Sequence, residues 1–169
     1  ITKPAYAFEI DQASAFDPAA DFIKRKFTTK DSLSLQHKAL LIYQELIAFH
    51  LHDPKPDALI DADLKRLSFV KENSTHPEKD QLYFNSINHI ARQYDKLPAA
   101  AQAWYLLAQY YNEQANDYKP HGDTTNRYAR IKAKEICEQL QSQKDSSEGK
   151  INAWNLLNAG MRAPIPQAG

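Results

Sequence analysis

The chain has 169 residues, of which 43% are hydrophobic and 25% charged, and both fractions are ordinary for a folded domain. Lysine plus arginine equals aspartate plus glutamate at 21 each, which argues against a nucleic-acid-binding protein. One cysteine excludes an internal disulfide, and no apolar run approaches the roughly 20 residues that a membrane span requires. Because the chain begins with Ile1 and not with methionine, we expect a trimmed or processed segment, in which a missing targeting signal is uninformative.

The N-terminal part predicts an extended segment followed by two helices. Residues 1–15 lack helical periodicity and are expected to run extended over the surface. An N-cap aspartate followed by proline predicts a short helix from Asp17 to about Phe27. The next helix, capped by Asp31 or Ser32, ends before the prolines that follow Asp53. It carries two adjoining apolar stripes and is therefore expected to lie centrally. These stripes are Leu40, Tyr43, Ile47 and Leu51, and beside them Ile42, Leu46 and Phe49.

Two further helices are predicted in the middle of the chain. The first spans about Asp57 to Glu72. Thr75 and Glu78 have the spacing of a capping box, which predicts the start of the next helix. That helix has one apolar face and stops before Leu97-Pro98. The face consists of Tyr83, Ile87, Ile90, Ala91 and Tyr94.

The fifth predicted helix carries a packing pattern built around a tryptophan. The pattern consists of Trp104, Leu107, Ala108 and Tyr111, and it matches the first helix of a tetratricopeptide repeat. The small Ala108 would let a second helix approach closely, while the two aromatic rings flank that contact. A polar loop from Asn116 to Thr125 follows.

The sixth predicted helix offers small residues that would face this pattern, namely Ala129 and Ala133, followed by Ile136, Cys137 and Leu140. The seventh begins a second copy of the pattern with Trp154 and Leu157, fifty residues after Trp104. Because the repeat usually has a period near 34 residues, longer helices and the polar loop would absorb the difference. The alternative is that two amphipathic helices acquired similar phrases by chance.

These patterns predict an all-α fold of about seven helices in a tetratricopeptide-like array of antiparallel α-α pairs. We expect a single helical domain over residues 16–160 and a flexible tail over 161–169.

The sequence offers little chemistry, and we expect neither an enzyme nor a bound cofactor. It contains no Gly-x-Ser-x-Gly, phosphate loop or dinucleotide fingerprint. His50, His52 and Asp53 are metal-ligating types, but residues two apart on a helix point to different faces. Cys137 lies on an apolar face, the usual place for an inert packing cysteine.

Three tyrosines are the candidates for a partner-binding surface, because exposed tyrosines suit protein contacts. They are Tyr105, Tyr110 and Tyr118. Tyr105 and Tyr110 fall off the face that carries Trp104 and Tyr111. Packing against a neighbouring helix is the alternative for these side chains.

Three phrases carry a resemblance to a known family: FHLHD (49–53), ALIDADLKRLSFVKEN (58–73) and YARIKAKEICEQL (128–140). They resemble the N-terminal helical region of bacterial alpha-2-macroglobulin-like proteins, over about residues 15 to 160. The resemblance implies a non-catalytic helical segment of a larger extracytoplasmic, protease-trapping protein, with other domains of that chain or a protein as partner.

The thioester of that family needs a cysteine with a glutamine three residues later. Here Cys137-Glu138-Gln139 places the glutamine two away, so we expect no thioester. The alternative to the whole resemblance is a freestanding tetratricopeptide-like module that binds a peptide or partner protein.

Overall fold

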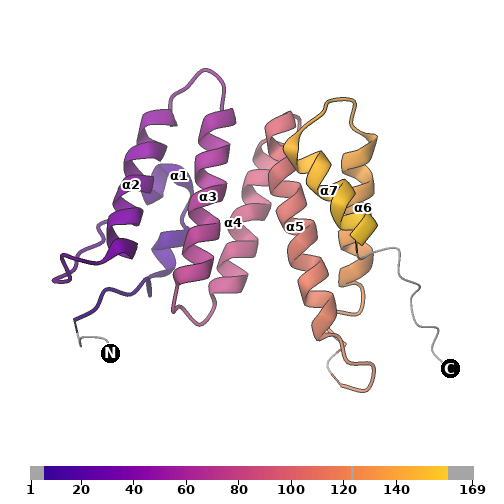
Figure 1. The fold of residues 1–169 in the computed structure, drawn as a ribbon, viewed down its shortest axis with the longest axis horizontal. Coiled ribbons are helices and arrows are strands. Elements are labelled where there is room, and N and C mark those ends of the chain that lie inside the picture. Colours follow the sequence, from indigo (N-terminus) through magenta and orange to yellow (C-terminus); the bar gives the residue numbers. More distant parts are fainter. Residues whose placement is uncertain (1–5, 123, 160–169) are drawn as a thin grey trace. The chain divides into compact units, whose positions relative to one another are not determined.

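The structure is a computed structural model that describes residues 6–122 and 124–159 (Figure 1). Over these residues the chain forms seven α-helices and three short 3-10 helices, and its only β-type pairing is one isolated bridge between Ile10 and Ser74. The predicted all-α class is therefore confirmed. The helices are α1 (Ala19–Phe22), α2 (Leu35–His50), α3 (Asp57–Asn73), α4 (Lys79–Gln93), α5 (Ala101–Gln114), α6 (Ala129–Ser142) and α7 (Glu148–Ala159). The 3-10 helices are η1 (Ala13–Phe16), η2 (Pro98–Ala100) and η3 (Ala115–Asp117).

Contacts divide the chain into two compact units, residues 1–86 and 87–169, and the boundary falls within α4. The single helical domain expected over residues 16–160 stays a prediction. The flexible tail that we expected over 161–169 lies outside the described residues.

The N-terminal segment enters the core of the first unit, so the expectation of a surface segment is wrong for its described part. Phe8 and Ile10 are buried. The carbonyl of Ile10 accepts hydrogen bonds from the Ser74 hydroxyl at 2.7 Å and from the Thr75 amide at 3.0 Å. Two apolar side chains on alternate residues gain more by burial than by exposure, and the end of α3 supplies the polar partners that a buried extended backbone needs.

The buried side chain of Arg66 binds the backbone of residues 15–17, which follow the N-terminal segment. Arg66 of α3 is 0% exposed, and its guanidinium donates to the carbonyls of Ala15 and Asp17 at 2.6 and 2.9 Å. The same group pairs with Asp63 at 2.5 Å and lies 4.4 Å from the centre of the Phe22 ring. Burial lowers the pKa of Arg66, while Asp63 opposes that shift. A buried charge needs such partners.

These contacts explain why α1 is much shorter than the helix predicted from Asp17 to Phe27. Gln44 of α2 donates to the carbonyls of Phe22 and Arg25, both at 2.8 Å. A continuing helix would use these carbonyls for its own ladder. The chain instead bends so that Phe22 and Phe27 are both buried, with ring centres 5.7 Å apart.

Two predicted helix caps are also wrong. Ser34, and neither Asp31 nor Ser32, caps α2 by accepting from the His37 amide at 3.1 Å. Asp31 instead accepts from the Phe8 amide at 3.2 Å. At α4 the Glu78 amide donates to the His76 ring, and the helix begins at Lys79, so Thr75 does not form the predicted capping box.

In the second unit, α5, α6 and α7 lie beside one another (Figure 1), and their shared core consists mostly of small residues. A methyl group on Gly149, in the first turn of α7, would lie 2.2 Å from the carbonyl carbon of Ala101 in α5. Ala153 lies one turn further along α7 and is fully buried. The two helix backbones therefore approach closely where α7 lacks bulky side chains.

Candidate interaction surfaces

The structure does not place Trp154 as a packing wedge, so this part of the repeat prediction is wrong. Its side chain is 51% exposed. Gly149 and Ala153 occupy the face of α7 that approaches α5, and an indole cannot fit where the backbones are so close. The second copy of the pattern therefore leaves its tryptophan at the surface, whereas Ala153 beside it is buried.

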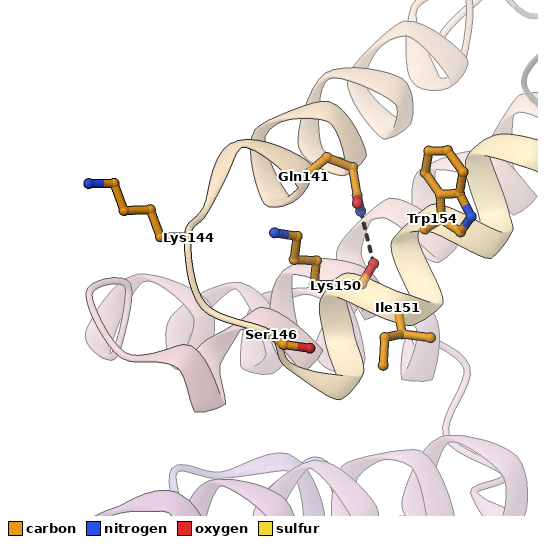
Figure 2. A pocket seen from close by; sticks show the side chains of 6 residues that line it. All are labelled: Gln141, Lys144, Ser146, Lys150, Ile151 and Trp154. Carbon is orange, nitrogen blue, oxygen red and sulfur yellow. Dashed lines mark hydrogen bonds between the residues drawn. The ribbon is translucent and has the colours of Figure 1, made fainter.

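Trp154 borders a hollow of about 220 Å³ at the turn between α6 and α7 (Figure 2). The hollow is lined by Gln141, Lys144, Ser146, Lys150, Ile151 and Trp154. Two of these residues make hydrogen bonds across the turn. The Lys150 ammonium donates to the carbonyl of Gln143, and the Gln141 amide donates to the carbonyl of Lys150 at 2.8 Å. Gln141 and Lys150 thus close the turn.

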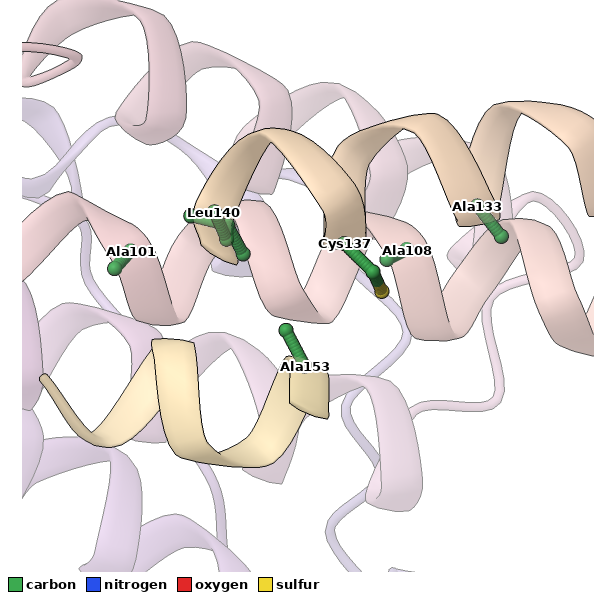
Figure 3. Packing of buried hydrophobic residues seen from close by; sticks show 6 residues of the cluster. All are labelled: Ala101, Ala108, Ala133, Cys137, Leu140 and Ala153. Atoms are coloured by element: carbon green, nitrogen blue, oxygen red, sulfur yellow. The ribbon is translucent and has the colours of Figure 1, made fainter. Parts of the chain in front are cut away.

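The other predicted packing residues gather around the buried cluster of the second unit, which consists of Ala101, Ala108, Ala133, Cys137, Leu140 and Ala153 (Figure 3). Leu107 and Ala129 are buried as well. Partly buried side chains pack against the cluster, and these include Trp104, Tyr111, Ile136 and Leu157. The Trp104 indole also donates to Asp95 at 3.1 Å.

The residues considered for nucleophilic or metal chemistry are Cys137, His50, His52 and Asp53. Burial raises the pKa of the Cys137 thiol to about 11, so the reactive thiolate is scarce at neutral pH. His50 contacts Asp53 at 2.7 Å at the end of α2. No group of three metal-ligating side chains occurs in residues 6–122 and 124–159.

The three tyrosines proposed as a partner surface are each only partly exposed. Tyr105 packs against the buried cluster, and burial raises its pKa. Tyr110 meets the ring of Tyr111 edge to face, with centres 6.2 Å apart. Tyr118 follows η3 and is half-buried. Packing thus accounts for Tyr105 and Tyr110.

The largest set of exposed apolar side chains on one helix lies on α2 of the first unit. Leu35 is 78% exposed, Ile42 62%, Leu46 40% and Phe49 77%. In the other stripe of this helix, Leu40 and Ile47 are fully buried, and Tyr43 and Leu51 are half-buried. The expectation that α2 lies centrally is therefore wrong, because only one of its two stripes is covered.

The sequence contained a signal for this exposed face. Leu35, Ala39, Ile42, Leu46 and Phe49 are spaced four, three, four and three residues apart. This spacing is the heptad pattern of helices that pair with other helices. Ile42, Leu46 and Phe49 were expected to be covered, and Leu35 and Ala39 belonged to neither predicted stripe.

No described helix is both long and apolar enough to cross a lipid bilayer. No family model, curated protein or solved structure matches this chain.

Proposed function

We propose that this chain is a non-catalytic helical scaffold that makes protein contacts, and that it forms part of a larger extracytoplasmic alpha-2-macroglobulin-like protein that traps proteases. The single observation that carries the interaction role is the exposed apolar face of α2. Contiguous exposed apolar surface of this kind marks protein interaction sites. The resemblance in residues 49–53, 58–73 and 128–140 supports the identity of the parent protein.

The chemistry of the described residues supports a scaffold over an enzyme. Cys137 is buried in a packing cluster, and Gln141 and Lys150 near Trp154 are engaged in closing a turn. Three of the helices, α5, α6 and α7, instead share one buried core.

The parent protein tests the family part of this proposal. The open reading frame should continue into long β-rich sequence, and in a thioester-bearing member it should contain Cys-x-x-Gln. The expressed full-length protein should retain a protease after cleavage, seen as protease that co-elutes with it in gel filtration. A full-length protein without β-rich domains, or one from which the protease always elutes separately, would instead favour the freestanding module.

A variant pair tests the interaction role in the same full-length protein. Ile42→Asp should weaken chemical cross-links from α2 to its partner, whereas Ile131→Asp should preserve them. Ile131 is the matched control because it is an exposed isoleucine of α6, 46% exposed and off the α2 face. Equal cross-linking in both variants would contradict an interaction role for α2.

A further inference from the structure

The exposed face of α2 has the register of a helix-pairing seam. We define the α2 seam as Leu35, Ala39, Ile42, Leu46 and Phe49. A repeat of 3.5 residues keeps such a seam in contact with a partner helix along its whole length, here across nearly the full 16 residues of α2. The opposite side of α2 packs within the first unit, because Leu40 and Ile47 are buried and Gln44 donates hydrogen bonds to the carbonyls of Phe22 and Arg25.

Charges border the seam on one edge. Lys38 and Glu45 are seven residues apart, so they lie on the same edge of the seam, and both are exposed. Neither belongs to any ion pair that the described part of the chain shows. An antiparallel partner helix would bring Lys38 of one copy opposite Glu45 of the second copy, and a two-fold axis would repeat this contact.

From these observations we infer that the α2 seam is a self-association surface, on which two copies of this chain pair α2 against α2 in antiparallel orientation. The Lys38–Glu45 contacts fix the two-fold axis near Leu41 and Ile42. The midpoint of Leu35 and Phe49 lies half a residue from this axis, so the same pairing brings Leu35 of one copy beside Phe49 of the second copy, and these are the two most exposed members of the seam. One antiparallel register thus allows both the Lys38–Glu45 ion pairs and the Leu35–Phe49 apolar contacts.

The size of the seam determines the strength of the pairing. From their exposed fractions, its four large side chains present roughly 450 Å² of apolar surface, which is the size of a functional surface patch. A standard specific interface buries about 800 Å² per partner. The seam alone is smaller, so the dimer is reversible and depends on concentration. This inference rests on the proposed function only in assigning α2 to protein contact.

Charge exchange tests the pairing, measured by sedimentation equilibrium over a concentration series of this chain. Lys38→Glu and Glu45→Lys each create two like-charge contacts in a homodimer, and each should raise the dimer dissociation constant about 10-fold or more. An equimolar mixture of the two variants should dimerise, because every contact between them is then of opposite charge. The double variant, Lys38→Glu with Glu45→Lys, should also dimerise.

Apolar variants complete the test. Ile42→Asp should abolish the dimer, and Ile131→Asp should leave the dissociation constant unchanged, with circular dichroism confirming that both remain folded. A wild-type chain that stays monomeric at its highest soluble concentration overturns self-association. A dimer whose dissociation constant is the same in Lys38→Glu and Glu45→Lys as in the wild type overturns the antiparallel α2 pairing. A dimer that is lost only in Ile131→Asp overturns it as well. These results do not depend on the open reading frame, so the family proposal and the pairing fail separately.

Discussion

The close approach of α7 to α5 predicts that Gly149→Ala destabilises the second unit. A methyl group on Gly149 would lie 2.2 Å from the carbonyl carbon of Ala101, 2.3 Å from the amide nitrogen of Gln102 and 2.4 Å from the carbonyl oxygen of Ala101. All three atoms belong to the backbone of α5, so no flexible side chain can move aside. The helices have to separate or shift along each other.

Two opposing effects determine the size of the change. Alanine is a better helix former than glycine by about 1 kcal/mol, which favours the variant. Overpacking a closely packed core costs about 1–3 kcal/mol, and a clash with backbone falls at the upper end of that range. The net loss in the free energy of unfolding is therefore about 2 kcal/mol. For a unit of this size the loss corresponds to a fall in Tm of roughly 10 °C.

The measurement is thermal and denaturant unfolding of the wild type and the variant, followed by tryptophan fluorescence. Both tryptophans of the chain, Trp104 and Trp154, lie in the second unit, so the signal reports on it. Gly122→Ala is the control, because its methyl group would meet only the Lys119 side chain, at 3.3 Å and beyond. The control should stay within about 0.5 kcal/mol of wild type. A Gly149→Ala variant as stable as wild type, or more stable, would refute the close approach of α7 and α5.

Two further predictions concern buried ionisable groups. Arg66→Met should cost about 3–5 kcal/mol of unfolding free energy in a urea titration, because it removes the guanidinium that pairs with the buried Asp63 carboxylate, and adding Asp63→Leu should recover much of that loss. Lys65→Ala, which breaks an exposed pair with Asp61, should cost under about 1 kcal/mol in the same titration, and equal costs would contradict a special role for the buried Arg66–Asp63 pair. The raised pKa of Cys137 means that the folded state keeps the proton while the unfolded state loses it, so the contribution of this thiol to stability is complete below pH 9.0 and is lost as the pH rises to about 11. Cys137→Ala should remove this part of the alkaline decline, and identical declines in the two proteins would contradict the assignment.

Local patterns were sufficient to predict much of the fold. The predicted span of α3, Asp57 to Glu72, differs from the observed helix by one residue, and α4 buries Tyr83, Ile87, Ile90 and Ala91 as its spacing indicates. In these helices one apolar face and its flanking turn residues determine the element without help from distant parts of the chain. Small residues at 108 and 133 likewise indicated where α5 and α6 pack.

The remaining features depend on contacts between residues far apart in the sequence. The shortening of α1 follows from Gln44 and Arg66, which lie about 20 and 50 residues away and take the carbonyls of this region. Trp154 was misplaced because a large aromatic residue normally gains by burial. Here the close approach at Gly149 leaves room only for small side chains between α7 and α5. No local pattern reports that distance between two helices.

The outer stripe of α2 presents the opposite situation, since its sequence is apolar but the fold does not bury it. Among the described residues, no buried side-chain nitrogen or oxygen lacks a hydrogen-bond partner. Exposed apolar side chains at the spacing of a helix pair add nothing to the stability of α2 on its own, and they favour aggregation. The proposed pairing of two copies would give Leu35, Ile42 and Phe49 a contact outside this fold, and in that proposal the exposed charges of Lys38 and Glu45 along the same edge specify its direction.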